Sequence, residues 1–160
     1  MFREMRRKKQ KLSMKECEDI LTKGSCGVLS LCGDDGYPYG VPISYVYDGS
    51  RLIFHSAAAG HKIDAIIRSP KASFCVIDQD QVVPEKYTTY FRSVIVFGTV
   101  RILEDEQEKR EAVEILSVKY APEDSADNRQ NMIEREWNSL CMLEMSLEHV
   151  SGKQAIELVP

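Results

Sequence analysis

Short strand-forming segments joined by tight turns are the feature that most constrains the fold of this chain. Residues 39–47 place apolar side chains at every second position, which is the period of a strand with one buried face. Asp48-Gly49, a strong hairpin signal, separates this segment from a second strand at 51–55. Further strands are predicted at 25–31, 72–77, 91–103, 140–147 and 153–159. The pattern predicts a mainly β fold, an antiparallel Greek-key-like barrel with flanking helices.

Segments with helical spacing lie between these strands, at 13–23, 60–68 and 105–120. The first begins with a capping box, in which Ser13 can cap the amide of Glu16 while the Glu16 side chain reaches back. A short fourth helix is expected to end near Trp137, after a polar linker at 121–130. Residues 79–89 are polar and contain a proline, so they are predicted to form a loop.

The composition is that of a single globular domain. The chain has 160 residues, of which 43% are hydrophobic and 29% are charged. A net charge of −4 argues against a nucleic-acid partner, which requires a basic surface. Without a long apolar run or a signal-peptide pattern, no membrane association and a cytoplasmic location are expected. The five cysteines show neither zinc-binding nor disulfide-framework spacing, so we expect reduced thiols and no metal site.

Residues 1–12 are predicted to form a basic arm in front of the single domain at 13–160. Between residues 3 and 11, six Lys and Arg side chains stand against one acid, Glu4. Such a run is usually a solvated and partly disordered tail. The alternative is that some of these cations reach an anionic ligand or a partner subunit.

The segment from His55 to Lys62 has the residue types of an anion-binding site. A strand ends at His55, small residues follow, and a helix begins near Gly60, where the first backbone amides are free to bind an anion. Ser56, His61 and Lys62 add side-chain donors at the same point. The alternative is that His55 simply ends a strand and Lys62 is solvated.

Pro42 interrupts the strand predicted at 39–47. Because proline cannot donate a ladder hydrogen bond, this strand is expected at a sheet edge or bulged at that position. Tyrosines flank the proline, so the segment could offer unpaired backbone groups beside an apolar face, which suits a flat heterocycle. The alternative is that the tyrosines are core residues at strand spacing.

Together the two segments resemble one family. Residues 37–47 read Y-P-Y-x-V-P-x-x-Y-V-Y and residues 54–62 read F-H-S-A-x-x-G-H-K. Both patterns are similar to the nitroimidazole-resistance (Nim) branch of the pyridoxamine 5′-phosphate oxidase-like flavoproteins. Three further segments match the same branch: Met5-Arg6-Arg7, residues 91–98 and, in the form K-R-E-A-x-x-x-L-x-x-K-Y, residues 109–120. The resemblance covers nearly the whole chain.

The resemblance implies an FMN-binding split β-barrel that forms a homodimer with two flavin sites at its interface. It implies that the flavin ring lies along Val41, Pro42, Ile43 and Ser44. It implies that the flavin phosphate lies near His55, Ser56, His61 and Lys62. Ser93 is implied to contact the flavin from the same or from the other subunit. Because a histidine at the Gly-His-Lys position is linked to the substrate pocket in this branch, His61 is either a phosphate ligand or a substrate-pocket residue.

The function hypothesis that results is an FMN-dependent reductase of small electron-poor aromatics such as nitroimidazoles. His61 is the candidate catalytic proton donor, because imidazole titrates near neutral pH. One alternative is a non-enzymatic module that holds FMN or haem, with His55, His61 and His149 as candidate axial ligands. Another is an oxidase of pyridoxamine 5′-phosphate, but the C-terminal segment 154–160 lacks the arginine signature of those enzymes.

Overall fold

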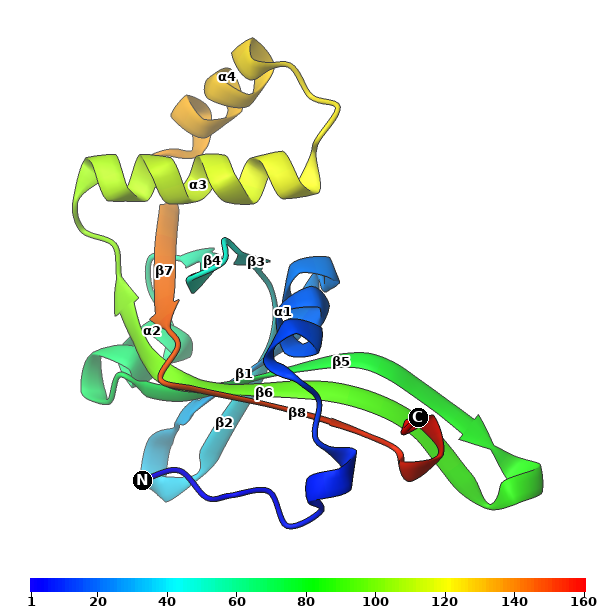
Figure 1. The fold of residues 1–160 in the computed structure, drawn as a ribbon. Helices are drawn as coiled ribbons and strands as arrows, with labels where there is room; N and C mark the ends of the chain where they lie inside the picture. Colours follow the sequence, from blue (N-terminus) through cyan, green and yellow to red (C-terminus); the bar gives the residue numbers. More distant parts are fainter.

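The computed structural model describes residues 1–160 as an open antiparallel β-barrel with helices outside it (Figure 1). The strands pair in the order β2-β1-β5-β6-β7-β4-β3, and β8 pairs with β6. Because β2 and β3 stand at the two ends of this order, the barrel is split between them. The predicted split barrel is confirmed. The strands are β1 Cys26–Cys32, β2 Pro38–Ser44, β3 Val46–Tyr47, β4 Arg51–Ala57, β5 Lys71–Val83, β6 Thr88–Ile102, β7 Leu140–Ser146 and β8 His149–Gln154.

The chain also forms four α-helices: α1 Met14–Lys23 precedes β1, α2 His61–Arg68 joins β4 to β5, and α3 Glu106–Tyr120 and α4 Ala126–Glu136 lie between β6 and β7. The capping box of α1 forms as predicted, since the Glu16 amide donates to Ser13 Oγ at 3.3 Å and the Ser13 amide donates to the Glu16 carboxylate at 2.8 Å. Asp105 and Ser125 cap the amides at the starts of α3 and α4. No helix combines the length and the apolar character needed to cross a membrane.

Strand β6 belongs to both halves of the barrel and joins them. Its first part pairs with β5 and β8, and its last residues, Val100–Ile102, pair with β7. Gly98 lies just before the pairing changes. A Cβ atom at this position would lie 1.7 Å from the carbonyl oxygen of Ser146, so glycine allows β6 to pass directly against the end of β7.

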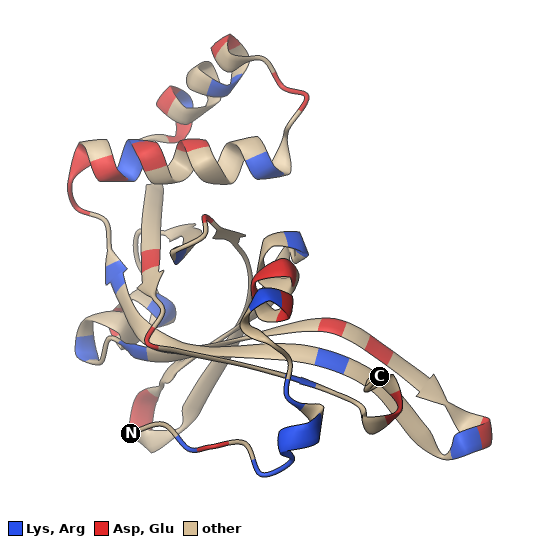
Figure 2. Ribbon diagram, viewed as in Figure 1, with Lys and Arg blue, Asp and Glu red and all other residues tan.

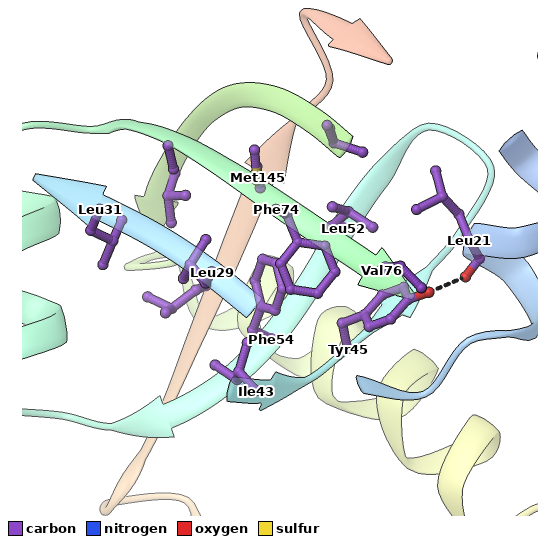
Figure 3. Close-up of a cluster of buried hydrophobic side chains, with 14 of the residues drawn as sticks. Leu21, Leu29, Leu31, Ile43, Tyr45, Leu52, Phe54, Phe74, Val76 and Met145 are labelled. Atoms are coloured by element: carbon purple, nitrogen blue, oxygen red, sulfur yellow. Dashed lines mark hydrogen bonds between the residues drawn. The ribbon is translucent and has the colours of Figure 1, made fainter. Parts of the chain in front are cut away.

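The main hydrophobic core fills the barrel with inward-facing side chains of its strands (Figure 3). Phe54 and Phe74 are fully buried and meet edge to face, with ring centroids 5.1 Å apart. Tyr45 packs on Phe74 at 4.9 Å and donates its hydroxyl hydrogen to the Leu21 carbonyl of α1 at 2.7 Å. A second core, which includes Ile53, lies on the other face of β4 beneath α3. Strand β4 therefore separates two packed layers.

Residues 79–89 do not form the predicted loop but are most of a long β-hairpin. The two strands stay paired out to Val83 and Thr88. Only Pro84–Lys86 turn, as a short 3-10 helix, and Tyr87 follows with a φ of 50° and an exposed fraction of 98%. The hairpin projects beyond the barrel (Figure 1), where polar side chains suit its solvated faces. Because of that polarity, the sequence of residues 79–89 predicted a loop.

The last strand is also misplaced in the sequence-based prediction. It was expected at 153–159, but β8 ends at Gln154 and a 3-10 helix follows at Ile156–Leu158. Gly152 has the character of a turn residue, yet it lies inside β8 for a packing reason. A Cβ atom there would lie 2.5 Å from the sulfur of Cys17, so α1 can approach β8 only because no side chain intervenes.

Two more boundaries differ from the expectation. The polar linker predicted at 121–130 is shorter, because α4 already begins at Ala126. The strand predicted at 39–47 is divided into β2 and β3, with Tyr45 between them. Its first part, β2, is an edge strand of the pairing order, as Pro42 predicted.

The basic N-terminal segment is attached to β8 at both of its ends. Phe2 stacks on His149 with ring centroids 4.8 Å apart. Leu12 is buried, and its amide donates to the carbonyl oxygen of Gly152 at 3.0 Å. Between these contacts the Lys and Arg side chains stay exposed and make the segment the most basic part of the chain in Figure 2.

The close passage of β6 against β7 gives a stability prediction. Gly98→Ala should destabilise the fold by about 1–3 kcal/mol, the usual cost of forcing extra volume into a packed site, because the backbone must shift to clear Ser146. The matched control is Gly40→Ala on the edge strand, where the nearest atom to the new methyl is 3.4 Å away. Urea unfolding should show less than about 0.5 kcal/mol change for the control. Equal stability of the two variants would contradict this account of the barrel corner.

Candidate functional site

A cavity of about 460 Å³ lies between the α3–α4 hairpin and the barrel. The helices supply an apolar roof that includes Val113, Leu116 and Ile133. The barrel supplies Ser44 from the end of β2 and His55 from β4. Ligand pockets usually measure about 300–1,000 Å³ and combine an apolar wall with a few polar groups, and this cavity meets both conditions.

Charged side chains of α3 and α4 hold the roof together. Arg129 of α4 donates from Nε to Glu114 of α3 at 2.7 Å, and its side chain is only 14% exposed. At the other end of the hairpin, the Lys109 ammonium and the Arg110 guanidinium lie 4.2 and 4.6 Å from the ring centroid of Trp137. The roof is therefore fixed at two places.

The two neighbouring residues His55 and Ser56 face different parts of the structure. Successive side chains of a strand point to opposite faces. His55 faces the cavity, on the same side of β4 as the buried Ile53 of the second core. Ser56 falls on the barrel face with Phe54 and pairs in register with Cys141 of β7. The two side chains cannot both contact one group of a bound ligand.

Lys62, the second residue of α2, is half-buried near the C-terminal end of β4. Burial lowers the pKa of its ammonium, and the Cys141 thiol is close enough to affect that pKa in the opposite direction. No carboxylate acts on this lysine, so its charge lacks a counter-ion within the chain. Since Cys141 is the register partner of Ser56, Ser56 and Lys62 lie in one neighbourhood at the end of β4. An unpaired, half-buried ammonium can attract an anion.

His61, at the first position of α2, binds back to strand β2 and to the turn before it. Its ring stacks on Tyr39 with centroids 4.0 Å apart, and its Nε2 lies 3.6 Å from a carboxylate oxygen of Asp34. Arg68 at the other end of α2 donates to the same carboxylate at 2.8 Å. These contacts bring the helix start and the prolyl strand together. Tyr39 is five residues from Ser44, or about 16 Å along the strand, so His61 lies far from the cavity.

The other candidates on β2 divide between its two faces. Ile43 is buried and Val41 packs against the barrel core, so a ligand outside the barrel can meet only their backbone. Pro42 points outward and is exposed. It begins a row of outward-facing register partners that crosses the sheet: Pro42, Val28, Cys75, Ile95 and Ser151.

Ser93 lies on the same outer face, two residues before Ile95 on β6. It pairs with Ile77 of β5 and Lys153 of β8. Three strand spacings separate β6 from β2, which is about 14 Å. Within one chain, Ser93 therefore does not share a site with Ser44.

The contribution of α3 and α4 to the cavity was not predicted from the sequence. The stripe of Val113, Leu116 and Tyr120 was visible at helical spacing, but that spacing is the same for a helix that packs on a core and one that roofs a cavity. Met132 and Ile133 lie in the short helix that was expected before Trp137, but its sequence did not show that they face a cavity. No sequence pattern distinguishes these cases without the packing.

The architecture of the chain defines a split β-barrel with a cavity roofed by helices. The family model described as pyridoxamine 5′-phosphate oxidase matches residues 13–154. The chain therefore belongs to this family, which confirms the resemblance seen in its sequence.

Three similar proteins illustrate the relationship. The protein RA0666 of Rhizobium meliloti (strain 1021), described as uncharacterized, is 34% identical over 87 residues, which are 54% of this chain and 52% of that protein. The chain thus spans about half the length of this curated relative. The crystal structure of an FAD-binding protein (mll6688) from Mesorhizobium loti has a TM-score of 0.67 and 28% identity, over 91% of this chain and 97% of that one.

The third protein is a candidate 5-nitroimidazole antibiotic resistance protein from Bacteroides thetaiotaomicron VPI-5482. Its crystal structure has a TM-score of 0.73 and 21% sequence identity, over 90% of this chain and 86% of that one. At this level of identity the likeness concerns the fold alone.

Proposed function

We propose that the protein is an FMN-binding flavoprotein that works as a homodimer and reduces small, electron-poor aromatic compounds. The observation that carries this proposal is the apolar cavity, in which the end of the prolyl strand and the strand leading to Gly-His-Lys meet under a helical roof. A mostly apolar cavity whose polar groups include Ser44 and His55 fits a flat heterocycle. Membership of the family and the FAD-binding structural neighbour support a flavin as that heterocycle.

Backbone amides and side chains of this chain would hold the cofactor. Amides at the end of β2, near Ser44, would donate to the ring, and Lys62 with Ser56 would bind the phosphate. The half-buried ammonium of Lys62 fits that role because it lacks a counter-ion. When bound, FMN supplies the electron-transfer chemistry, and the protein orients it and limits water around it.

The outer face of the main sheet supports a second copy of the chain as partner. Its centre carries apolar and small side chains, among them Val28, Cys75 and Ile95, and no helix of the chain covers it. Ser93 lies on this face, where it would contact the flavin of the partner. A homodimer would thus explain why Ser93 and the cavity are far apart in one subunit.

His55 is the imidazole that lines the cavity, whereas His61 is held against Tyr39 and Asp34. We therefore assign the role of proton donor to His55, although the sequence motif favoured His61. An imidazole titrates in the range that suits proton transfer near neutral pH.

Reduction of a nitroimidazole tests the function directly. Denatured protein should release FMN, identified by mass spectrometry, and the reduced, FMN-loaded protein should bleach the nitro absorbance of the drug under anaerobic conditions. His55→Gln should slow this by about a hundredfold, the low end for general acid catalysis. His61→Gln is the matched control and should leave the rate within about twofold. An unchanged drug spectrum with the parent protein refutes reductase activity, and a haem spectrum of the purified protein refutes the flavin.

A lysine variant tests the phosphate contact. Lys62→Met should weaken FMN binding by about 1.5–3 kcal/mol, the value of a charge-assisted hydrogen bond. It should not lower the melting temperature of the ligand-free protein, because burial already disfavours the charge of this lysine. The FMN affinity is measured by fluorescence titration. The control is Lys71→Met, at an exposed lysine that begins β5. Equal FMN affinity of both variants would exclude Lys62 from the phosphate site.

A charge on the outer sheet face tests the dimer. Ile95→Glu should give a monomer in sedimentation velocity and lose FMN, because a carboxylate would be buried without a partner at the interface. Val118→Glu, on the exposed side of α3, introduces the same charge away from this face and should remain dimeric. If Ile95→Glu remains a dimer, the subunits associate through another surface.

A further inference from the structure

The C-terminal end of α3 meets the barrel where β2 gives way to β3. Tyr45 lies between these strands, so its backbone is not part of either ladder. The hydroxyl of Tyr120, the last residue of α3, accepts a hydrogen bond from the Tyr45 amide at 3.0 Å. The same hydroxyl lies 2.8 Å from the Tyr45 carbonyl oxygen and also contacts the carbonyl oxygen of Ser25. One side-chain oxygen thus serves three backbone groups.

A tyrosine hydroxyl has one hydrogen to donate and lone pairs to accept. It can accept from the Tyr45 amide while it donates to one of the two carbonyl groups at a time. The Tyr45 amide also donates to the Ser25 carbonyl at 3.2 Å, which joins β1 to the same point. Tyr120 therefore takes the place of the neighbouring strand that the split barrel lacks.

This contact sits directly beside the cavity. The Tyr45 amide belongs to the peptide group that it shares with Ser44, and Ser44 lines the cavity. The side chain of Tyr120 lines the cavity as well. Tyr120 thus connects the helical roof to the backbone of the barrel wall.

We infer that Tyr120 is a positioning residue: it holds the Tyr45 amide and thereby fixes the direction of the adjoining Ser44 amide, which belongs to the wall of the cavity. The inference rests on the proposed flavin site, because its consequence is for the ligand in the cavity. Amides that point steadily at the ring favour its reduced, negatively charged form over the oxidised form. Loss of the hydroxyl would weaken that preference.

The neighbouring residue provides a matched control. The Lys119 ammonium donates to the carbonyl oxygens of Thr22, at 3.3 Å, and Gly24, and it lies 4.7 Å from the centroid of the Tyr45 ring. It anchors the same end of α3 to the barrel but makes no hydrogen bond to the Ser44–Tyr45 peptide. Lys119→Met therefore loosens the helix end without removing the contact in question.

The experiment compares Tyr120→Phe, Lys119→Met and the parent protein by titration with oxidised and reduced FMN and by thermal unfolding. Tyr120→Phe removes one oxygen atom and keeps the ring. It should lose about tenfold more affinity for reduced than for oxidised FMN, which lowers the two-electron potential of the bound flavin by about 30 mV. Lys119→Met should lower the melting temperature and leave the potential unchanged.

The other outcomes overturn the inference. An unchanged potential in Tyr120→Phe, or the same shift in both variants, would mean that Tyr120 only stabilises the fold. A Tyr120→Phe protein that is unfolded at 25 °C would mean the same. If the parent binds no FMN, the proposed function fails and this inference fails with it, whereas FMN binding with an unshifted potential removes the inference alone.

Discussion

The barrel depends on how the chain crosses from one half to the other at Tyr45, where the sheet is split. The Tyr45 ring packs on Phe74 in the core, and its hydroxyl donates to the Leu21 carbonyl at the end of α1. Its amide is shared between the Ser25 carbonyl and the Tyr120 hydroxyl. One residue thus fixes α1, α3, β5 and the start of β1. Burial raises the pKa of its phenol, so the hydroxyl stays a donor. An open barrel needs such a point because no continuous ladder satisfies the backbone there.

The sequence predicted the parts of the fold in which local pattern and tertiary packing agree. The capping box of α1, the turn at Asp48-Gly49 and the edge position of the proline strand all depend on neighbours within a few residues. The β5–β6 hairpin was missed because its strands are held by each other beyond the barrel, where polarity carries no information about pairing. Strand β8 was misplaced because Gly152 is required by the approach of Cys17, a contact that links residues far apart in sequence.

The candidate site was predictable to the extent that its residues lie on the two motif segments. Ser44 and His55 do meet at one cavity, and His61 does contact the prolyl strand through Tyr39. The sequence predicted that the strand at 51–55 ends at His55, whereas β4 continues to Ala57, so strand alternation also applies to Ser56 and turns it to the side opposite His55. The sequence could not show the helical roof, because the apolar stripe of α3 predicts burial but not what it covers.

Two features of the single chain cost folding free energy without serving the fold. The Lys62 ammonium is half-buried with no counter-ion, and apolar side chains such as Val28 and Ile95 remain exposed on the outer sheet face. Stability alone would favour a methionine at position 62 and polar side chains at the exposed apolar positions of the sheet face. Costs of this kind are found where a protein keeps a surface for binding. An anion beside Lys62 and a second subunit over the sheet would each remove one of them, as the proposed flavin site at a subunit interface requires.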